Sequence, residues 1–290
     1  MSDYRVITDA TCDIDPALAE AHHIQVIPME VILDDKTFYH YADFRNYPAK
    51  DYYQKLREGA KSHTSAINPQ TYIDTFTPVL KGGEDILYLC FSSGLSSTYQ
   101  SSVLAVSQLR DEFPDRKIYT IDTLCACGGE GFLVYYTALN HEQGMSIEDN
   151  AAWADKEKMH VAHWFTVSDL FFLKRGGRVS AATAIAGSAL QIKPLMHVDN
   201  EGHLIAVGKV HGRKASVRAM FEKMKATIVH PEGQTVMISQ ADCMEDALTL
   251  KQMILESLPV KEVIISTIGP VVGCHGGPTM LTLFFWATER

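Results

Sequence analysis

The fold class of this 290-residue chain is decided by the stretch Ile86-Leu87-Tyr88-Leu89-Cys90-Phe91-Ser92-Ser93-Gly94-Leu95-Ser96-Ser97-Thr98. Its first six residues form a short apolar run, which is typical of a strand buried on both faces of a parallel sheet. A polar loop follows, and a helical pattern then runs from residue 96 to residue 112. A strand, a loop and a helix in direct succession are the unit from which α/β proteins are built.

Similar units lie on both sides of this stretch. In the first half we predict strands at 4–8, 24–33, 86–91 and 117–121 and helices at 16–22, 49–59, 69–80, 96–112 and 125–143. In the second half we predict strands at 161–166, 235–239, 261–267 and 279–287, a hairpin of 194–198 with 204–207, and helices at 179–190, 214–227 and 244–258. The pattern indicates an N-terminal doubly wound, mainly parallel domain (1–155) and a C-terminal mixed α/β domain (156–290), with a boundary near residues 145–158 and a ligand between them.

Composition limits the classes of function. Hydrophobic residues make up 46% of the chain and charged residues 21%, so the chain can form a folded core. The 26 Lys and Arg against 35 Asp and Glu leave a net charge of -9, which disfavours nucleic acid as a partner. The sequence shows no secretory leader and no membrane-spanning stretch, and we expect a cytoplasmic protein. The 6 Cys form no CxxC pair and the 12 His no HExxH motif, so we expect reduced thiols and no metal site.

The polar loop at residues 92–98 carries the clearest sign of a ligand site. Its hydroxyls and the free backbone N–H groups at the start of a helix favour an anion. The alternative is that Ser96 only caps the helix. A nucleophilic serine would need a G-x-S-x-G motif, which the loop lacks, so a hydrolase is disfavoured. The polar loop at residues 8–13 also follows a strand, and we expect the two loops to face one another.

Three further segments carry polar or charged groups. His63-Thr64-Ser65 precedes a helix, and helix capping is the alternative to ligand binding there. Residues 269–278 place His275 in a Gly/Pro-rich turn, where it either donates to a carboxylate or is merely solvated. Residues 173–180 form the densest basic element, with Lys174, Arg175 and Arg178 around two glycines. That element is suited to a phosphate or to a structural turn, and it is no P-loop because no G-K-[ST] follows.

Taken in order, these segments resemble the DegV family of bacterial lipid-binding proteins over essentially the whole chain. The matching pieces are Thr8-Asp9-Ala10-Thr11-Cys12-Asp13, Thr64-Ser65, Ser92-Ser93-Gly94-Leu95-Ser96, Thr98-Tyr99-Gln100, Lys174-Arg175-Gly176-Gly177-Arg178-Val179-Ser180, Lys193-Pro194, Gly269-Pro270, Gly273, His275, Gly277 and Pro278.

The resemblance implies a two-domain DegV-like (EDD) fold that buries the tail of one long-chain fatty acid between the domains, with no cofactor and no catalysis of its own. It also implies a lipid-carrying subunit that presents the carboxylate to a separate ATP-binding fatty acid kinase subunit for acyl-phosphate formation. By the matching positions, Thr64, Ser93 and His275 would bind the carboxylate. The residues expected at or near the carboxylate are Thr64, Ser65, Ser92, Ser93, Gly94, Ser96 and His275.

The basic residues have an expected role of their own. Those expected to face the kinase partner or a phosphate are Lys174, Arg175, Arg178 and Arg213.

Two competing interpretations stay open. One is a serine acyl hydrolase or transferase that uses Ser93 with His275 as its base. The other is a nucleotide-binding regulator that uses Arg175 and Arg178.

The chain departs from the family pattern at a few positions. Ala66-Ile67 stands where Gln-Pro is frequent, and Ser97 and Thr279 stand where Gly is usual. These departures affect the expected tail preference and loop geometry more than the carboxylate site. His211-Gly212-Arg213 replaces a more basic stretch, which bears on partner docking.

Overall fold

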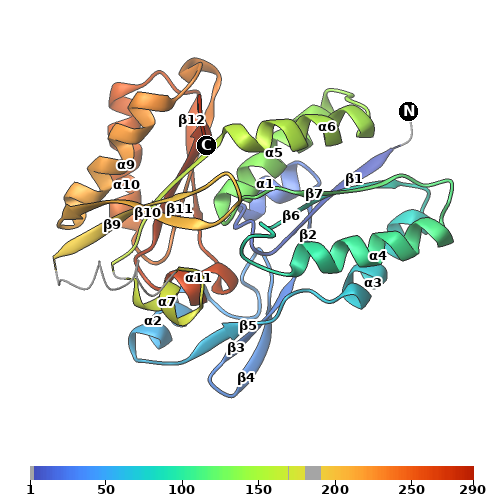
Figure 1. Cartoon of the computed structure of the whole chain (residues 1–290), viewed down its shortest axis with the longest axis horizontal. Coiled ribbons are helices and arrows are strands. Elements are labelled where there is room, and N and C mark those ends of the chain that lie inside the picture. The colour runs from blue at the N-terminus through green and yellow to red at the C-terminus, as the bar shows by residue number, and fades with distance from the viewer. Residues whose placement is uncertain (1–2, 169, 180–190) are drawn as a thin grey trace.

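The computed structural model describes residues 3–168, 170–179 and 191–290. Within these residues the strands form a four-stranded, a three-stranded and a six-stranded sheet. Helix α5 (Gly128–Glu142) packs against strands of both larger sheets, and Figure 1 shows it between them, with the three-stranded sheet below. The predicted α/β class, with one parallel and one mixed sheet, is confirmed.

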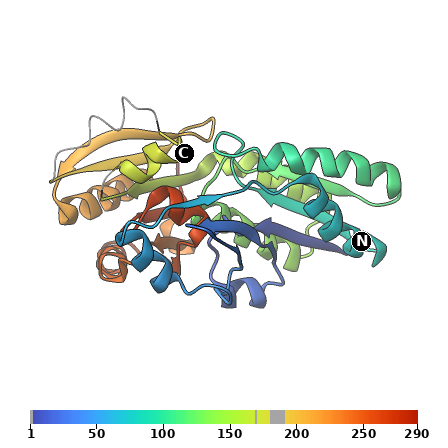
Figure 2. The ribbon, with the colours of Figure 1, turned by 90° about the horizontal axis from the view of Figure 1, so that it is seen from below.

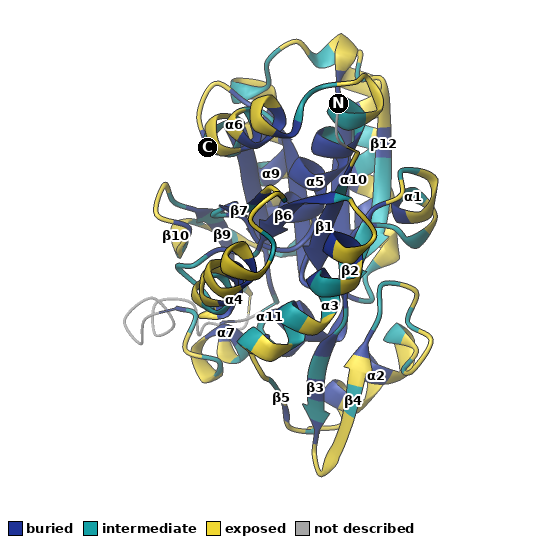
Figure 3. Cartoon of the chain, turned by 90° about the vertical axis from the view of Figure 1, so that its right-hand side faces the viewer, coloured by how far each residue is buried: buried dark blue, intermediate teal, exposed yellow. Residues whose placement is uncertain are grey.

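The four-stranded sheet is parallel and has the order β2-β1-β6-β7. Its strands are β1 (Tyr4–Asp9), β2 (Gln25–Ile27), β6 (Asp85–Cys90) and β7 (Ile118–Asp122). Its helices, besides α5, are α1 (Pro16–Ala21), α3 (Pro69–Lys81), α4 (Thr98–Glu112) and α6 (Ile147–Glu157). Helices α3 and α4 cover one face and α5 and α6 the other, so the sheet is doubly wound as predicted (Figure 1). Figure 3 shows the buried strands beneath helices whose outer faces are exposed, and every residue of β6 is buried.

The six-stranded sheet has the order β10-β9-β8-β13-β11-β12 and is antiparallel except for the β11–β12 pair. Its strands are β8 (Val161–Thr166), β9 (Ile192–Val198), β10 (Leu204–His211), β11 (Thr235–Gln240), β12 (Glu262–Thr267) and β13 (Leu281–Trp286). Helices α9 (Arg213–Thr227) and α10 (Met244–Ser257) pack against it. Side chains alternate along β13, so Leu283 joins the core under α9 and α10 while Phe284 joins the core around α5.

The predicted strand at 24–33 is wrong as a single element. It is divided into β2, which joins the parallel sheet, and β3 (Met29–Leu33), which joins the three-stranded sheet. Pro28 separates them, since its nitrogen carries no hydrogen and cannot continue the ladder. Strands β4 (Lys36–His40) and β5 (Ser62–Thr64), which pair with β3, were not predicted. Both are short: β5 has no apolar residue and β4 only Phe38 and Tyr39, so neither has the apolar run that indicates a strand.

The segment at 269–278, predicted as a turn between strands, contains helix α11 (Pro270–Gly276). Proline at the first helical position pre-sets the backbone angle that a helix needs. The helix is buried against helix α2 (Ala49–Arg57) and the three-stranded sheet. A Cβ on Gly273 would lie 2.4 Å from the Tyr53 hydroxyl oxygen, so glycine is required for this close packing. The Gly/Pro-rich composition of residues 269–278 therefore reflects this close packing of the helix rather than a turn.

Helix α6 was not predicted, and it occupies most of the segment 145–158 where the domain boundary was expected. Several of the remaining elements lie close to their predicted ranges. The hairpin of β9 and β10 is confirmed, and β8 has the predicted bounds. The basic segment begins as the short helix α7 (Phe171–Arg175) and then turns at Gly176 and Gly177. The helix predicted at 179–190, including the expected cap Ser180, lies outside the described residues from residue 180 onward. Two short 3-10 helices, η1 (Lys158–His160) and η2 (Pro231–Gly233), complete the described elements.

The hydrophobic core is shared between the two halves of the chain. One buried cluster contains Leu87 of the parallel sheet together with Phe165 and Phe284 of the six-stranded sheet. A second cluster lies between the six-stranded sheet and helices α9 and α10. The predicted division at residue 155 therefore stays a prediction, because one core crosses it. Across the described residues, the helices are too short or too polar to cross a membrane.

Candidate functional site between the two sheets

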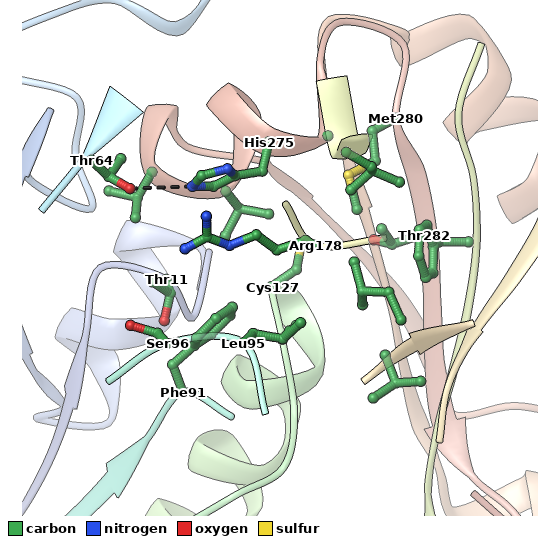
Figure 4. Close-up of a pocket in the computed structure, with 18 of the residues that line it drawn as sticks. Thr11, Thr64, Phe91, Leu95, Ser96, Cys127, Arg178, His275, Met280 and Thr282 are labelled. Atoms are coloured by element: carbon green, nitrogen blue, oxygen red, sulfur yellow. Dashed lines mark hydrogen bonds between the residues drawn. The ribbon is translucent and has the colours of Figure 1, made fainter. Parts of the chain in front are cut away.

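A cavity of about 350 Å³ lies where the parallel sheet, the six-stranded sheet, α5 and α11 meet. This volume falls within the range of about 300–1,000 Å³ that is usual for small-molecule sites. Segments far apart in the sequence contribute to its wall, and Figure 4 shows how their side chains converge. The predicted loop at the end of β6 supplies Phe91, Leu95 and Ser96.

Most of the cavity wall is apolar. On the six-stranded sheet, Phe165 of β8 and Phe284 of β13 face the cavity, and Val198 and Leu204 of the hairpin extend the same wall. The sheet places these side chains on one face because alternate residues of a strand point to the same side. Such a wall accommodates an alkyl chain, which gains stability by leaving water.

Polar side chains gather at one end of the cavity. Thr64, at the end of β5, lies with its Oγ1 3.2 Å from Nε2 of His275, which α11 carries. The Arg178 side chain extends into the same region from the segment that follows α7, and Figure 4 shows it beside the Thr64–His275 pair. Three groups able to hold an anion thus converge from three segments that are distant in the sequence.

His275 is neutral in this environment. Burial, together with the nearby charges of Arg178 and Arg175, lowers the pKa of His275 to about 4. Its Nδ1 is buried and, among the described residues, has no hydrogen-bond partner. A Cβ on Gly176 would lie 2.4 Å from this Nδ1, so the glycine after α7 lets the ring pack closely. A carboxylate next to the ring would favour its protonated form and partly offset the burial.

Arg178 is the cation that reaches the cavity. Its guanidinium donates to the carbonyl oxygen of Gly176, which fixes the side chain across the turn. No acidic side chain of the described segments forms an ion pair with it. A half-buried guanidinium without a carboxylate partner is suited to a ligand carboxylate or phosphate, which it can bind through two parallel hydrogen bonds.

The residues expected at the carboxylate divide into two groups. Thr64, Ser65, Ser96 and His275 line the cavity. The Ser65 hydroxyl donates to Glu30 at 2.9 Å, and Ser96 Oγ accepts the Thr98 N–H at 3.2 Å, close to the predicted capping role.

The other three expected residues are absent from the cavity wall of the described chain. The Ser92 hydroxyl is fully buried and donates to the carbonyl oxygen of Gly202 at 2.9 Å. Backbone N–H groups of Ser93 and Gly94 donate to Asp122 and to Ser92 Oγ, at 3.1 Å each. The hydroxyl within hydrogen-bond distance of His275 belongs to Thr64 and not to Ser93, so the geometry of this structure does not form a Ser93–His275 catalytic pair.

The other basic residues lie elsewhere. Lys174 and Arg175 are exposed on α7, where the Arg175 guanidinium lies 4.9 Å from the centre of the Phe172 ring. Arg213 donates to Asp246 at 2.8 Å and to the Thr279 carbonyl oxygen at 2.7 Å. Arg213 thus ties together the elements at this end of the six-stranded sheet and lies outside the cavity wall.

Thr11 and Cys127 also line the cavity, although neither was predicted as a site residue. Thr11 Oγ1 lies 2.5 Å from an Asp9 oxygen and 2.7 Å from a Glu130 oxygen. One hydroxyl hydrogen cannot serve both, so one of the two carboxyl groups must carry a proton and donate it. Burial raises the pKa of Glu130 well above its usual value, which is consistent with Glu130 being that group. The polar loop after the first strand was the sequence signal for this network.

A family model described as "Uncharacterised protein, DegV family" matches residues 3–288. The chain belongs to the DegV family. This DegV protein is 39% identical over 285 residues to a DegV domain-containing protein of Clostridium perfringens, with 98% of each chain covered. A fatty-acid-binding DegV family protein from Thermus thermophilus has a TM-score of 0.88 at 28% identity, over 99% of this chain and 100% of that one. The fatty acid kinase B3 protein of Streptococcus pneumoniae, solved with linoleic acid, shares the fold at a TM-score of 0.86 and 21% identity, over 98% and 99% of the two chains.

Proposed function

We propose that this DegV protein binds one long-chain fatty acid, with the tail against the apolar wall of the cavity and the carboxylate at the end formed by Thr64, Arg178 and His275. The observation that carries the proposal is the combination of an apolar cavity with a guanidinium at its polar end that pairs with no carboxylate of the described residues. Fatty acid binding by the Thermus thermophilus relative supports it.

The two parts of the ligand have different roles in binding. A tail of about 15 methylenes contributes at most about 12 kcal/mol, at roughly 0.8 kcal/mol each, and ordering costs remove much of it. The tail therefore provides affinity. Each charge-assisted hydrogen bond to the carboxylate contributes about 1.5–3 kcal/mol, which selects acids over alcohols of equal length.

The same geometry supports a carrier role. The carboxylate end of the cavity lies beside the segment that carries α7, where Lys174 and Arg175 are exposed on an otherwise acidic protein. A basic surface next to a bound carboxylate is suited to an ATP-binding kinase subunit, because it attracts the phosphates that must approach the carboxylate. The fold is shared with the fatty acid kinase B3 protein of Streptococcus pneumoniae. This similarity is consistent with a kinase partner that forms the acyl phosphate.

Native mass spectrometry of the purified protein tests the binding proposal. The expected result is an added mass of one fatty acid per chain, which disappears after delipidation and returns with added palmitate or oleate. His275→Ala and Arg178→Gln should each weaken binding of the acid by about 10–100-fold while changing binding of the matching alcohol by less than about threefold. Lys174→Gln, on the exposed face of α7, is the control and should bind normally. Equal losses for acid and alcohol would reject the assignment of the carboxylate end.

A further inference from the structure

The turn of the β9–β10 hairpin, residues 199–202, touches the loop at residues 92–97, which we call the serine loop. Ser92 donates its hydroxyl hydrogen to the carbonyl oxygen of Gly202 at 2.9 Å and accepts the Gly94 N–H at 3.1 Å. Ser92 is fully buried, so this bond is shielded from water. Figure 2 shows the hairpin extending from the six-stranded sheet toward the start of α4.

The contact requires glycine on both sides. A Cβ on Gly202 would lie 2.1 Å from Ser92 Oγ and 3.3 Å from the Cα of Leu124, and Gly202 has a φ of +79°. A Cβ on Gly94 would lie 2.7 Å from the carbonyl oxygen of Glu201. The separations of 2.1 Å and 2.7 Å are too short for a Cβ, so the two segments can pack this closely only with glycine at positions 94 and 202.

Hydrogen bonds within the turn brace it internally. The Asp199 carboxylate accepts the backbone N–H groups of Glu201 at 3.0 Å and His203 at 2.9 Å. The Gly202 N–H donates to the carbonyl oxygen of Asp199 at 3.0 Å. A short-range network of this kind is typical of a rigid turn, so its position is set by the hairpin and by the contact with Ser92.

The contact joins opposite walls of the cavity. Val198 and Leu204, which flank the turn, line the cavity from the six-stranded sheet. Leu95 and Ser96 of the serine loop line it from the side of the parallel sheet. Ser92 of the serine loop and Gly202 of the turn hold these two walls together. Separating the turn from the serine loop would therefore open the cavity between the two sheets.

We propose that Gly202 and the turn it belongs to position the serine loop, and that this contact controls how fast the ligand enters and leaves the cavity. The inference rests on the proposed binding of a fatty acid. It assigns Ser92 a different role from that of a carboxylate ligand: Ser92 closes the cavity through Gly202. The two roles have different consequences, because a closing contact affects every ligand in the cavity, whereas a carboxylate contact affects acids alone.

Stopped-flow kinetics with a fluorescent long-chain fatty acid and a matching fluorescent alcohol test the proposal. Gly202→Ala and Ser92→Ala should each raise the association and dissociation rates together by about fivefold or more, for the acid and the alcohol alike, with Kd changed by less than about threefold. Gly144→Ala is the matched control. Gly144 has a φ of +85° with nothing within 4 Å of a Cβ, so it carries the same backbone strain without the collision.

A double variant separates the specific contact from general destabilisation. In Gly202→Ala the new methyl collides with Ser92 Oγ, and Ser92→Ala removes that atom. The double variant should therefore exchange ligand no faster than Gly202→Ala alone, with the two effects less than additive. Simple addition of the two effects would overturn the proposed contact, as would unchanged rates in Gly202→Ala. An effect of Ser92→Ala on the acid alone would assign Ser92 to the carboxylate and overturn the proposal.

Amide hydrogen exchange gives a readout that does not depend on the ligand. Residues 92–97 and 199–204 should exchange faster in Gly202→Ala than in Gly144→Ala, because the contact that protects them is lost. If the wild-type protein bound neither fatty acid nor alcohol, the proposed function would fail. Unchanged exchange in these two segments would overturn the positioning role whatever the ligand result.

Discussion

His275, Thr64 and Arg178 show how individual residues acquire a role through their surroundings. From the family resemblance, Thr64 and His275 were expected to bind the carboxylate, whereas Arg178 was expected to face the kinase partner or a phosphate. In the structure the three lie at one end of an apolar cavity, and burial keeps His275 neutral. A neutral imidazole next to a guanidinium leaves the guanidinium as the main positive charge for a ligand to meet.

Asp13 provides a test of burial at a single residue. It is buried, its Oδ1 accepts the Gly269 N–H at 2.6 Å, and burial raises its pKa to about 8. Between about pH 4 and pH 8 the folded protein therefore holds a proton that the unfolded chain has released, so stability falls as pH rises through this window. Asp13→Asn keeps the acceptor and removes the titration. Urea unfolding at pH 5 and pH 8 should show the wild type losing about 2–4 kcal/mol more than the variant.

Asp35→Asn, on the exposed turn between β3 and β4, is the control for this measurement. It should lose the same stability as the wild type between the two pH values. Groups other than Asp13 contribute equally to the wild type and to Asp13→Asn, so their titration cancels in the difference. Parallel pH profiles for wild type and Asp13→Asn would contradict the buried, protonated state of Asp13.

Among the secondary-structure elements, the long apolar ones were predictable and the short packed ones were not. β6 was predictable because a continuous apolar run has few other solutions. The helix α11 and the strand β5 were not, because seven and three residues carry too little periodicity. Their stability comes from burial against neighbours, which local sequence does not record. Both elements position site residues, so the carboxylate end was the part of the site hardest to locate.

Helix α3 illustrates a local signal that can be tested. The sequence offered His63-Thr64-Ser65 as its cap, but Asn68 occupies the N-cap position and accepts the Thr71 N–H at 3.0 Å. Asn68→Ala should destabilise the protein by about 1 kcal/mol, whereas Asn68→Asp should retain most of the stability because it keeps the acceptor. Denaturant unfolding measures both variants. Equal stabilities for Asn68→Ala and Asn68→Asp would show that this bond does not stabilise the helix start.

The molecule as a whole is joined around the cavity. The larger core includes side chains from both sheets, and the hairpin turn and the serine loop join opposite walls of the cavity. A ligand between the sheets therefore contacts both halves of the chain at once.

Ligand binding should accordingly stabilise the whole chain. At a free fatty acid concentration of 100 times Kd, the free energy of unfolding should rise by about 2.7 kcal/mol. Calorimetry should show a single unfolding transition moving to higher temperature, because the ligand binds only when both walls are in place. The matching alcohol at the same concentration should give a smaller shift. A shift confined to one of two separate transitions would indicate that the ligand contacts one half alone.

The amino-acid sequence was sufficient for the α/β class, the doubly wound parallel sheet, the hairpin and the family, because these depend on apolar periodicity and on short motifs that are read locally. The tertiary structure was needed to separate two kinds of serine-loop residue, since Ser96 lines the cavity while Ser92 is bound to Gly202 from the other sheet. It was also needed to bring Arg178 to the Thr64–His275 pair. The physical reason is that ligand sites depend on distances between segments remote in the chain, and those distances arise only when the sheets pack.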